Sequence, residues 1–220
     1  MNAPATIGPA DRFLASLATA ERRETPFRHW LLDRVLPEPL ARAIADLPVA
    51  PAQIDDTRGK RETHNSTRRF FAAGDLDTPA TRGLGEAFQS PPVVRALVEA
   101  TGAELAGTNL RIEYCRDTDG FWLEPHTDIG AKSFTMLIYV SETPAAAGWG
   151  TDIYDADKRH LGAAPGGFDK GLIFVPGADT WHGFEKRRIQ GVRKSLIVNY
   201  VKPEWRARHE LAYPETPVAY

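Results

Sequence analysis

The sequence lacks the features that mark several common protein classes. Its 220 residues include a single cysteine, Cys115, which excludes an internal disulfide framework and favours a reducing compartment. Acidic and basic residues nearly balance, 29 against 27, so a formal net charge of −2 gives no general attraction to nucleic acid. No run of eighteen apolar residues occurs, and residues 1–12 have no basic stretch followed by an apolar one. We therefore expect a cytoplasmic protein that binds neither membrane nor nucleic acid.

The sequence also lacks an internal repeat and a linker long enough to separate two domains. With 42% hydrophobic residues, a chain of this length can bury one good core. We expect a single domain over 1–220, with a helix-rich support over 1–103, a core over 104–203 and a C-terminal tail over 204–220. The oligomeric state is not predicted.

Helical periodicity, with proline at helix starts and proline or glycine at helix ends, dominates the first part of the chain. We expect these helices to brace one face of the core. The expected elements are helices over 11–20, 37–47, 79–88 and 91–101, and a strand over 27–36.

Three residues of the second half have the chemistry of a metal site. His126 and Asp128 lie two positions apart at the end of a predicted strand, so both side chains can point to one face. His182 follows a short apolar run over 171–177 that ends in Pro-Gly. Two imidazoles and one carboxylate on one face of an iron(II) ion leave the opposite face open. The sequence therefore predicts a non-haem iron site.

Arg193 and Ser195 begin an alternating segment that follows His182 after a basic turn. We expect the segments of His182 and Arg193 to be adjacent strands of a hairpin, which would return the Arg193 side chain to the metal. A buried guanidinium needs a partner, and a carboxylate bound bidentately is the best one. Ser195, on the same face, could donate a second hydrogen bond to that carboxylate.

Together these residues resemble the iron(II)- and 2-oxoglutarate-dependent oxygenases, within them the prolyl-hydroxylase-like branch. The match consists of His126-x-Asp128, His182 and Arg193 in order, and it covers 105–203. The resemblance implies an α+β, mainly β fold whose core is a double-stranded β-helix (jelly roll) braced by the N-terminal helices. It also implies Fe(II), the cosubstrate 2-oxoglutarate and O2.

The resemblance assigns roles as well. In such enzymes the two histidines and the aspartate bind iron, and a basic residue holds the far carboxylate of 2-oxoglutarate. A tyrosine on an early core strand often hydrogen-bonds the cosubstrate; Tyr114 occupies a comparable place, and Tyr139 is a second candidate. Carried over, the catalytic and metal residues are His126, Asp128 and His182, and the cosubstrate residues are Arg193, Ser195, Tyr114 and Tyr139.

The implied reaction is hydroxylation of an unactivated C–H with release of succinate and CO2. Asp128 retains the metal carboxylate, which favours hydroxylation over halogenation. We expect a small substrate that is anionic or amino-acid-like, and a prolyl residue of a protein is the alternative. An alternative of another class is a cupin-like metal-binding protein without oxygenase activity, against which Arg193 and Ser195 argue.

A basic segment over 58–69 lies outside the expected core strands. It is either a solvated loop or a lid over the metal, whose Asn65, Arg68 or Arg69 grips a substrate carboxylate or phosphate. Tryptophans near the site could form the wall of the pocket. The candidate substrate residues are Asn65, Arg68, Arg69, Trp122 and Trp149.

Overall fold

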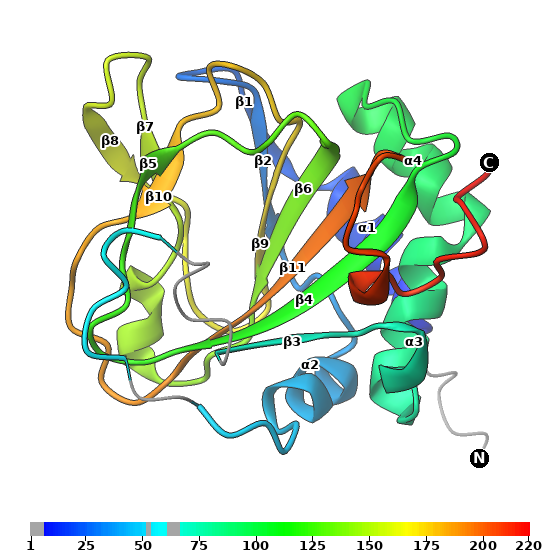
Figure 1. Ribbon diagram of the computed structural model, residues 1–220, viewed down its shortest axis with the longest axis horizontal. Coiled ribbons are helices and arrows are strands. Elements are labelled where there is room, and N and C mark those ends of the chain that lie inside the picture. Colours follow the sequence, from blue (N-terminus) through cyan, green and yellow to red (C-terminus); the bar gives the residue numbers. More distant parts are fainter. Residues whose placement is uncertain (1–6, 52–53, 61–66) are drawn as a thin grey trace.

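Two antiparallel sheets and a layer of helices form the fold (Figure 1). The computed structural model describes residues 7–51, 54–60 and 67–220. Within these residues the larger sheet has seven strands in the order β1-β2-β9-β6-β11-β4-β3, and the smaller has four in the order β5-β10-β7-β8. The larger sheet contains β1 (Glu21–Arg23), β2 (His29–Asp33), β3 (Arg68–Phe70), β4 (Asn109–Asp117), β6 (Lys132–Tyr139), β9 (Lys170–Phe174) and β11 (Arg193–Val201). The smaller sheet contains β5 (Leu123–His126), β7 (Asp152–Tyr154), β8 (His160–Ala163) and β10 (His182–Phe184).

From β4 onward the chain crosses repeatedly between the two sheets. β4, β6, β9 and β11 belong to the larger sheet, whereas β5, β7, β8 and β10 belong to the smaller one. Figure 1 shows the two sheets as facing layers, with β5 and β10 opposite the middle of the larger sheet. This alternation closes the strands into a jelly roll. The predicted fold class, mainly β with a jelly-roll core and N-terminal helices, is confirmed.

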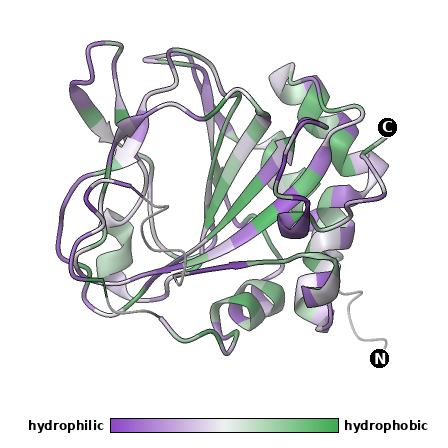
Figure 2. Cartoon of the chain, in the orientation of Figure 1, coloured by the Kyte–Doolittle hydropathy of each residue, from purple (hydrophilic) through white to green (hydrophobic). Residues whose placement is uncertain are grey.

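The larger sheet separates two environments because successive side chains of a strand point to opposite faces. On β4, Leu110, Ile112 and Tyr114 belong to the main hydrophobic core, which the sheet shares with the helices. The intervening Arg111 and Glu113 line a cavity on the other face. Figure 2 shows bands of apolar and polar residues along β4. One face of the sheet is therefore structural, and the other faces the space between the sheets.

The helices lie against the outer face of the larger sheet, on the side away from the smaller sheet (Figure 1). Each begins with proline in its first turn, where the missing N–H costs no hydrogen bond. Among the described residues, no helix is long and apolar enough to cross a membrane. The helices are α1 (Pro9–Ala18), α2 (Glu38–Ala45), α3 (Pro79–Gln89) and α4 (Pro91–Thr101), with short 3-10 helices η2 (Ala73–Asp75), η3 (Pro144–Gly148) and η4 (Arg208–Glu210).

All four predicted helices are present, with small shifts at their ends. The helix expected over 91–101 is α4, and Gly102 ends it in the left-handed region at φ 75°. The strand expected over 27–36 is the shorter β2. These elements could be predicted because their signals, periodicity and terminal residues, are local.

The expected hairpin between the segments of His182 and Arg193 is not formed. β10, which begins at His182, pairs with β5 and β7, whereas β11, which begins at Arg193, pairs with β4 and β6. β10 and β11 belong to opposite sheets of the jelly roll, so the pairing predicted from proximity in sequence is wrong. The two strands still face the same interior.

The C-terminal segment is part of the core structure rather than a loose tail. Leu211 forms an antiparallel bridge with Arg111 of β4, and Ala212 and Val218 are fully or almost fully buried. The N–H of Val218 donates to the carbonyl of Thr108 at 2.8 Å. The segment thus extends the edge of the larger sheet and can contribute side chains to the interior.

Candidate metal centre and cavity

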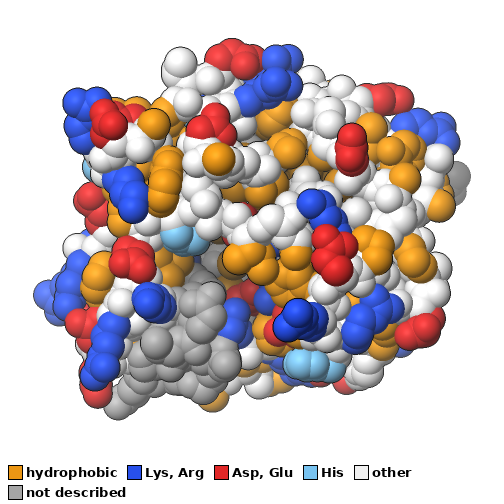
Figure 3. Space-filling view, turned by 45° about the horizontal axis from the view of Figure 1, so that its top comes forward, with side chains coloured by type: hydrophobic (Ala, Val, Ile, Leu, Met, Phe, Trp, Pro, Cys, Tyr) orange, Lys and Arg blue, Asp and Glu red, His pale blue; other side chains and the backbone are white. Residues whose placement is uncertain are grey.

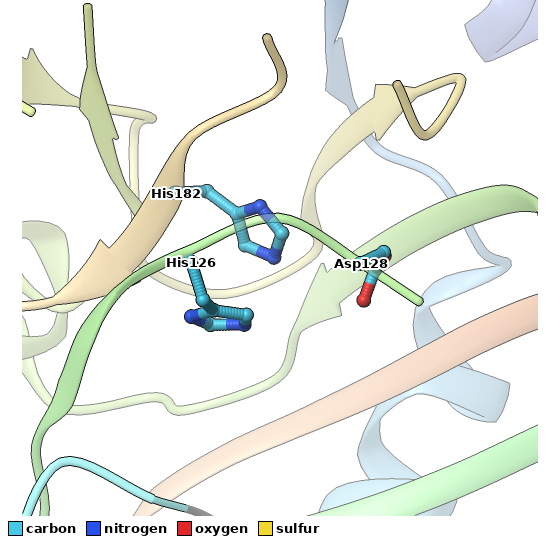
Figure 4. Close-up of side chains that lie close together, drawn as sticks. All are labelled: His126, Asp128 and His182. Atoms are coloured by element: carbon cyan, nitrogen blue, oxygen red, sulfur yellow. The ribbon is translucent and has the colours of Figure 1, made fainter. Parts of the chain in front are cut away.

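The three predicted metal ligands converge between the sheets (Figure 4). His126 ends β5 and His182 begins β10, and the two residues are direct partners in the ladder between these strands. Asp128 lies two residues beyond β5, so the loop, not a shared strand face, brings it to the histidines. One ligand atom from each residue lies within 4.8 Å of the other two. This spacing allows all three to bind one ion.

Backbone contacts fix which nitrogen of each imidazole is available. Nδ1 of His126 lies 2.8 Å from the carbonyl oxygen of Glu124, and Nδ1 of His182 lies 2.9 Å from that of Thr180. A carbonyl oxygen only accepts, so each Nδ1 carries the proton and donates. Each Nε2 is then left with a free lone pair, as a metal ligand requires.

Asp128 is held through both carboxylate oxygens. Lys132 Nζ donates to Oδ1 and Thr135 Oγ1 donates to Oδ2, each at 2.6 Å. Burial by itself raises the pKa of Asp128, but the Lys132 ammonium, His182 and these hydrogen bonds more than offset it and hold the pKa well below its usual value. An ionised carboxylate accepts about four hydrogen bonds or metal contacts, so positions remain for an ion.

His182 is nearly inaccessible to solvent, with 7% of its surface exposed. Burial lowers its pKa to about 4, although the Asp128 carboxylate acts in the opposite direction. The imidazole is therefore neutral at physiological pH, and its Nε2 lone pair is not blocked by a proton. The site combines two imidazole nitrogens and one anionic oxygen, with the Lys132 ammonium paired to Asp128.

A cavity of about 470 Å³ opens in front of the three residues, a size typical of small-molecule sites. Figure 3 shows the surface hollowed beside a histidine, next to the atoms drawn in grey. Apolar side chains from both sheets form part of the wall. The lining includes Gly59, Lys60, Arg68, Arg111, Glu113, Leu123, His126, Asp128, Ile129, Lys132, Thr135, Leu137, Thr151, His182, Phe184, Arg193, Ile197, Trp205 and Glu210.

Arg193 lines this cavity, as predicted, but it already has a carboxylate partner. Its Nη1 donates to Asp117 Oδ2 at 2.7 Å, and its Nε donates to the carbonyl oxygen of Trp149 at 2.8 Å. Asp117 is fully buried and is the register partner of Arg193 in the β4–β11 ladder. The buried guanidinium has the carboxylate partner that its burial requires, but this partner is Asp117 of the chain itself, and the role of Arg193 toward 2-oxoglutarate stays a prediction. Arg193 is still a buried cation on the cavity wall, above the Phe184 ring at 4.5 Å.

Ser195 and Tyr139 both lie on the inner side of the sheet, beside Arg193. Ser195 follows Arg193 on the same face of β11, and among the described residues its buried Oγ has no hydrogen-bond partner. The Tyr139 hydroxyl donates to Thr151 Oγ1 at 2.8 Å and accepts from the Thr151 N–H at 3.0 Å. Tyr139 therefore holds Thr151, and Thr151 lines the cavity.

Tyr114 does not belong to the site. Its ring is in the core between the sheet and the helices, and its hydroxyl donates to the carbonyl of Ala45 at 3.2 Å. Burial raises its pKa to about 12. The expectation that Tyr114 contacts the cosubstrate is wrong because Tyr114 shares the apolar face of β4.

Of the predicted substrate residues that the structure describes, only Arg68 lines the cavity. Its guanidinium lies 3.3 Å from Glu113 and is largely buried. Arg69, the next residue of β3, points to the other side and pairs with Asp75 at 2.8 Å. Asn65 lies outside the described residues.

Neither predicted tryptophan lines the cavity. The Trp122 indole N–H donates to Asp56 at 2.5 Å, and the Trp122 ring packs on Gly59, so this side chain fixes the segment before β3. Trp149 is buried in a separate apolar cluster and contributes its carbonyl oxygen to Arg193. The assignment of Trp122 and Trp149 to the pocket wall is wrong. Trp205, from the C-terminal segment, is the tryptophan that lines the described part of the cavity.

Several cavity residues were not predicted. Arg111 and Glu113 could have been, since they are the polar residues that alternate with the apolar face of β4. Lys132 and Thr135 lie on β6 within an otherwise apolar run. Trp205 and Glu210 follow the last strand, where no periodic pattern marks them.

Comparison with solved structures agrees with this architecture. A prolyl-4-hydroxylase from Pseudomonas putida aligns with 91% of this chain and 98% of its own at a TM-score of 0.56 and 16% identity. A 2OG-Fe(II) oxygenase family protein from Burkholderia pseudomallei aligns with 91% of this chain and 94% of its own, at a TM-score of 0.55 and 16% identity. A Trichoplax adhaerens prolyl hydroxylase, in complex with a hypoxia inducible factor peptide fragment, aligns with 90% of this chain and 91% of its own, at a TM-score of 0.55 and 14% identity. The sequence matches no family model and no curated protein. The chain therefore shares the fold of these proteins.

Proposed function

We propose that this protein is an iron(II)- and 2-oxoglutarate-dependent oxygenase that hydroxylates a small amino-acid-like acid. The observation that carries the proposal is the meeting of His126, Asp128 and His182 within 4.8 Å of one another at the wall of a cavity that also contains Arg193. Two nitrogens and one carboxylate oxygen are the protein ligands of a facial iron(II) site, which leaves three positions for other ligands.

The donor set fits the ion on chemical grounds. Nδ1 of each histidine faces a backbone carbonyl oxygen, so Nε2 is the nitrogen available to an ion, and Asp128 is anionic and oriented by Lys132 and Thr135. When bound, iron(II) with 2-oxoglutarate and O2 would supply the oxidising power for hydroxylation of an unactivated C–H, with release of succinate and CO2. The residues of the chain supply the geometry of the ligands and the cavity in which the substrate would lie.

A dicarboxylate fits the part of the cavity wall that Arg193 and Thr151 form. The guanidinium of Arg193 and the hydroxyl of Thr151 line the wall, and Ser195 lies between the lining residues Arg193 and Ile197 on one face of β11. Asp117 already offsets the charge of Arg193. Hydrogen bonds from neutral donors therefore contribute a larger share of the binding of a ligand carboxylate here than they would beside an unpaired cation. Ser195 is a buried donor of this kind.

Another part of the cavity wall has side chains of both charges. Arg68 and Arg111 supply cations, and Glu113 and Glu210 supply carboxylates, all on the lining. A substrate with a carboxylate and an amino group can bind such a surface with both groups, whereas a simple anion would be repelled by half of it. A cavity of about 470 Å³ accommodates a metabolite of this size. We therefore favour an amino-acid-like substrate, with Arg68 on its carboxylate.

The direct test is turnover. The iron(II)-loaded protein is incubated with 2-oxoglutarate, O2 and a panel of amino acids and small organic acids, and succinate is measured by NMR together with the mass of each acid. We expect succinate formation that depends on iron and that is accelerated by at least one amino acid gaining 16 Da. Asp128→Ala should abolish it. Acceleration only by acids without an amino group would refute the substrate class.

A second candidate substrate is a prolyl residue of a peptide. One observation favours it: Ile129, next to Asp128 at the rim of the cavity, is 60% exposed, and an exposed apolar side chain at a cavity mouth suits contact with a polypeptide. Two of the structures with the same fold are prolyl hydroxylases. Proline-containing peptides belong in the same turnover assay, and a 16 Da gain on a peptide but on no free acid would select this candidate.

A further inference from the structure

A continuous row of hydrogen bonds leads from the Asp128 carboxylate to Arg111, which also lines the cavity. Thr135 Oγ1 donates to Asp128 Oδ2 at 2.6 Å, and Asn199 Nδ2 donates to Thr135 Oγ1 at 2.9 Å. Arg111 Nη1 in turn donates to Asn199 Oδ1 at 3.1 Å. Asn199 is fully buried, and Thr135 and Arg111 are 2% and 4% exposed, so water does not compete for these bonds.

Each hydrogen bond of the row has only one consistent direction from donor to acceptor. The Arg111 guanidinium can only donate, so the atom of Asn199 that it meets is the amide oxygen. The Asn199 amide nitrogen then faces Thr135, and this forces the Thr135 hydroxyl to direct its proton at Asp128. The row therefore presents a single donor, in a fixed direction, to one oxygen of the metal ligand.

The far end of the row is firmly anchored. Arg111 donates from Nε to Glu210 at 2.6 Å and pairs with Glu113 at 2.9 Å. Its guanidinium lies over the rings of Phe70, at 4.7 Å, and Trp205, at 5.2 Å. Burial would lower the pKa of Arg111, but the two glutamates more than offset this and raise it. Glu210 comes from the C-terminal segment, so that segment helps to fix the orientation of Arg111.

We infer that Thr135, Asn199 and Arg111 are positioning residues for the metal ligand Asp128, and that Glu210 anchors them. The inference rests on the proposed function, because it takes His126, Asp128 and His182 as a metal site. Its physical basis is that a partner of a metal-binding side chain fixes the orientation of that side chain, and loss of such a partner typically costs 10–100-fold in metal affinity.

The experiment measures metal affinity directly, with no need for turnover. The full-length apoprotein is titrated with Mn(II) alone, and free Mn(II) is followed by electron paramagnetic resonance. Thr135→Val keeps the shape of the side chain but removes the donor, and we expect its Mn(II) affinity to fall about 10–100-fold. Thr135→Ser keeps the donor and should bind Mn(II) close to the wild-type affinity. Circular dichroism and thermal unfolding check that both variants fold.

The anchor is tested by a matched pair in the C-terminal segment. Glu210→Gln removes the charge that holds Arg111, and Glu204→Gln makes the same change at an exposed residue six positions earlier. We expect weaker Mn(II) binding in Glu210→Gln only. Equal affinity in the two variants would overturn the role of Glu210.

The outcomes separate the inference from the proposed function. Wild-type affinity in Thr135→Val, while His182→Ala loses Mn(II), would overturn the positioning row and leave the metal site intact. Absence of Mn(II) binding in the wild-type protein would overturn both. Weak binding in Thr135→Val with rescue by Thr135→Ser supports the row, since a general packing defect would not depend on one hydroxyl.

Discussion

At the scale of single residues, the hydroxyl of Ser195 stands out because a buried polar atom normally has a hydrogen-bond partner. Its Oγ has none among the described residues, and it lies beside Arg193 on the cavity side of β11. Such a group costs stability unless a ligand uses it. Arg193 is less informative as a test, because its removal would take the ion-pair partner Arg193 away from the buried Asp117 carboxylate and weaken the fold itself.

We predict that Ser195→Ala raises the Kd for 2-oxoglutarate about 10-fold or more, since a hydrogen bond to a charged group contributes about 1.5–3 kcal/mol. The measurement is calorimetric titration of the Mn(II)-loaded protein. Ser133→Ala, on β6 and outside the cavity lining, is the control and should leave the Kd unchanged. An unchanged Kd in Ser195→Ala would assign the far carboxylate to other donors.

Asp169 is a second residue with a measurable effect, here on stability. Burial raises its pKa to about 7, and its Oδ1 accepts the Leu36 N–H at 3.0 Å. An unfolded chain loses this proton near pH 4, whereas the folded protein keeps it up to about pH 7. Between these values the folded state binds more protons, so the contribution of Asp169 to stability falls as the pH rises and is lowest above about pH 7.

We therefore predict that Asp169→Asn is more stable than wild type at pH 8, by about 1–2 kcal/mol after allowance for partial solvation. Asparagine keeps the acceptor for Leu36 and tolerates the positive φ of 58°. Urea unfolding at pH 5 and pH 8 measures the effect, which should shrink at the lower pH. Asp77→Asn, at an exposed position, is the control, and an equal gain in both variants would show that net charge alone is responsible.

At the scale of elements, the helices support the larger sheet without contributing to the cavity lining. Helix α3 begins with a capping box: the Thr78 side chain accepts from the N–H of Thr81 at 3.1 Å, and the Thr81 side chain accepts from the N–H of Thr78 at 3.3 Å. We predict that Thr78→Ala lowers the free energy of unfolding by about 1 kcal/mol. Mn(II) affinity should stay at the wild-type value.

Thr143→Ala is the matched control for the cap. Thr143 precedes η3 in the equivalent position, but its side chain makes no capping hydrogen bond. Denaturant titration should show a change of less than about 0.5 kcal/mol in this variant. A loss of metal affinity in Thr78→Ala would mean that the helix layer acts on the site as well as on the fold.

The same elements show how far the sequence could predict the fold. Periodicity and terminal residues are local, so α3, α4 and β11 were predicted close to their observed bounds. Strand pairing is not local. The expected hairpin of β10 with β11 was wrong because each strand pairs in a different sheet, and no residue between them records this.

The site, like the fold, was predicted only in part from the sequence. His126, Asp128, His182 and Arg193 were found because their chemistry and order are distinctive. Tyr114 was misplaced although the period of two that identifies β4 also puts it on the apolar face with Leu110 and Ile112. By contrast, the Asp117 partner of Arg193 follows from the register between β4 and β11, which the sequence does not encode locally. Trp205 and Glu210 reach the cavity only through the packing of the C-terminal segment.

At the scale of the whole molecule, the two sheets supply different residues of the site. The larger sheet joins the helix layer through its apolar face and supplies Arg193, Ser195, Thr135 and Arg111 from the other. The smaller sheet supplies His126 and His182 from two paired strands. Lys132 and Thr135 of the larger sheet hold the Asp128 carboxylate beside these histidines, so metal binding should also stabilise the packing of the two sheets.

The central claim is that this site holds iron(II) and that 2-oxoglutarate chelates it. The most direct measurement is anaerobic titration of the iron(II)-loaded protein with 2-oxoglutarate, followed by visible absorption. We predict the metal-to-ligand charge-transfer band of a chelated keto acid, saturating at one equivalent per chain and absent in His182→Ala. If the wild-type protein bound iron(II) but gave no band at any concentration of 2-oxoglutarate, the claim would be contradicted, and a cupin-like metal-binding protein would be the better description.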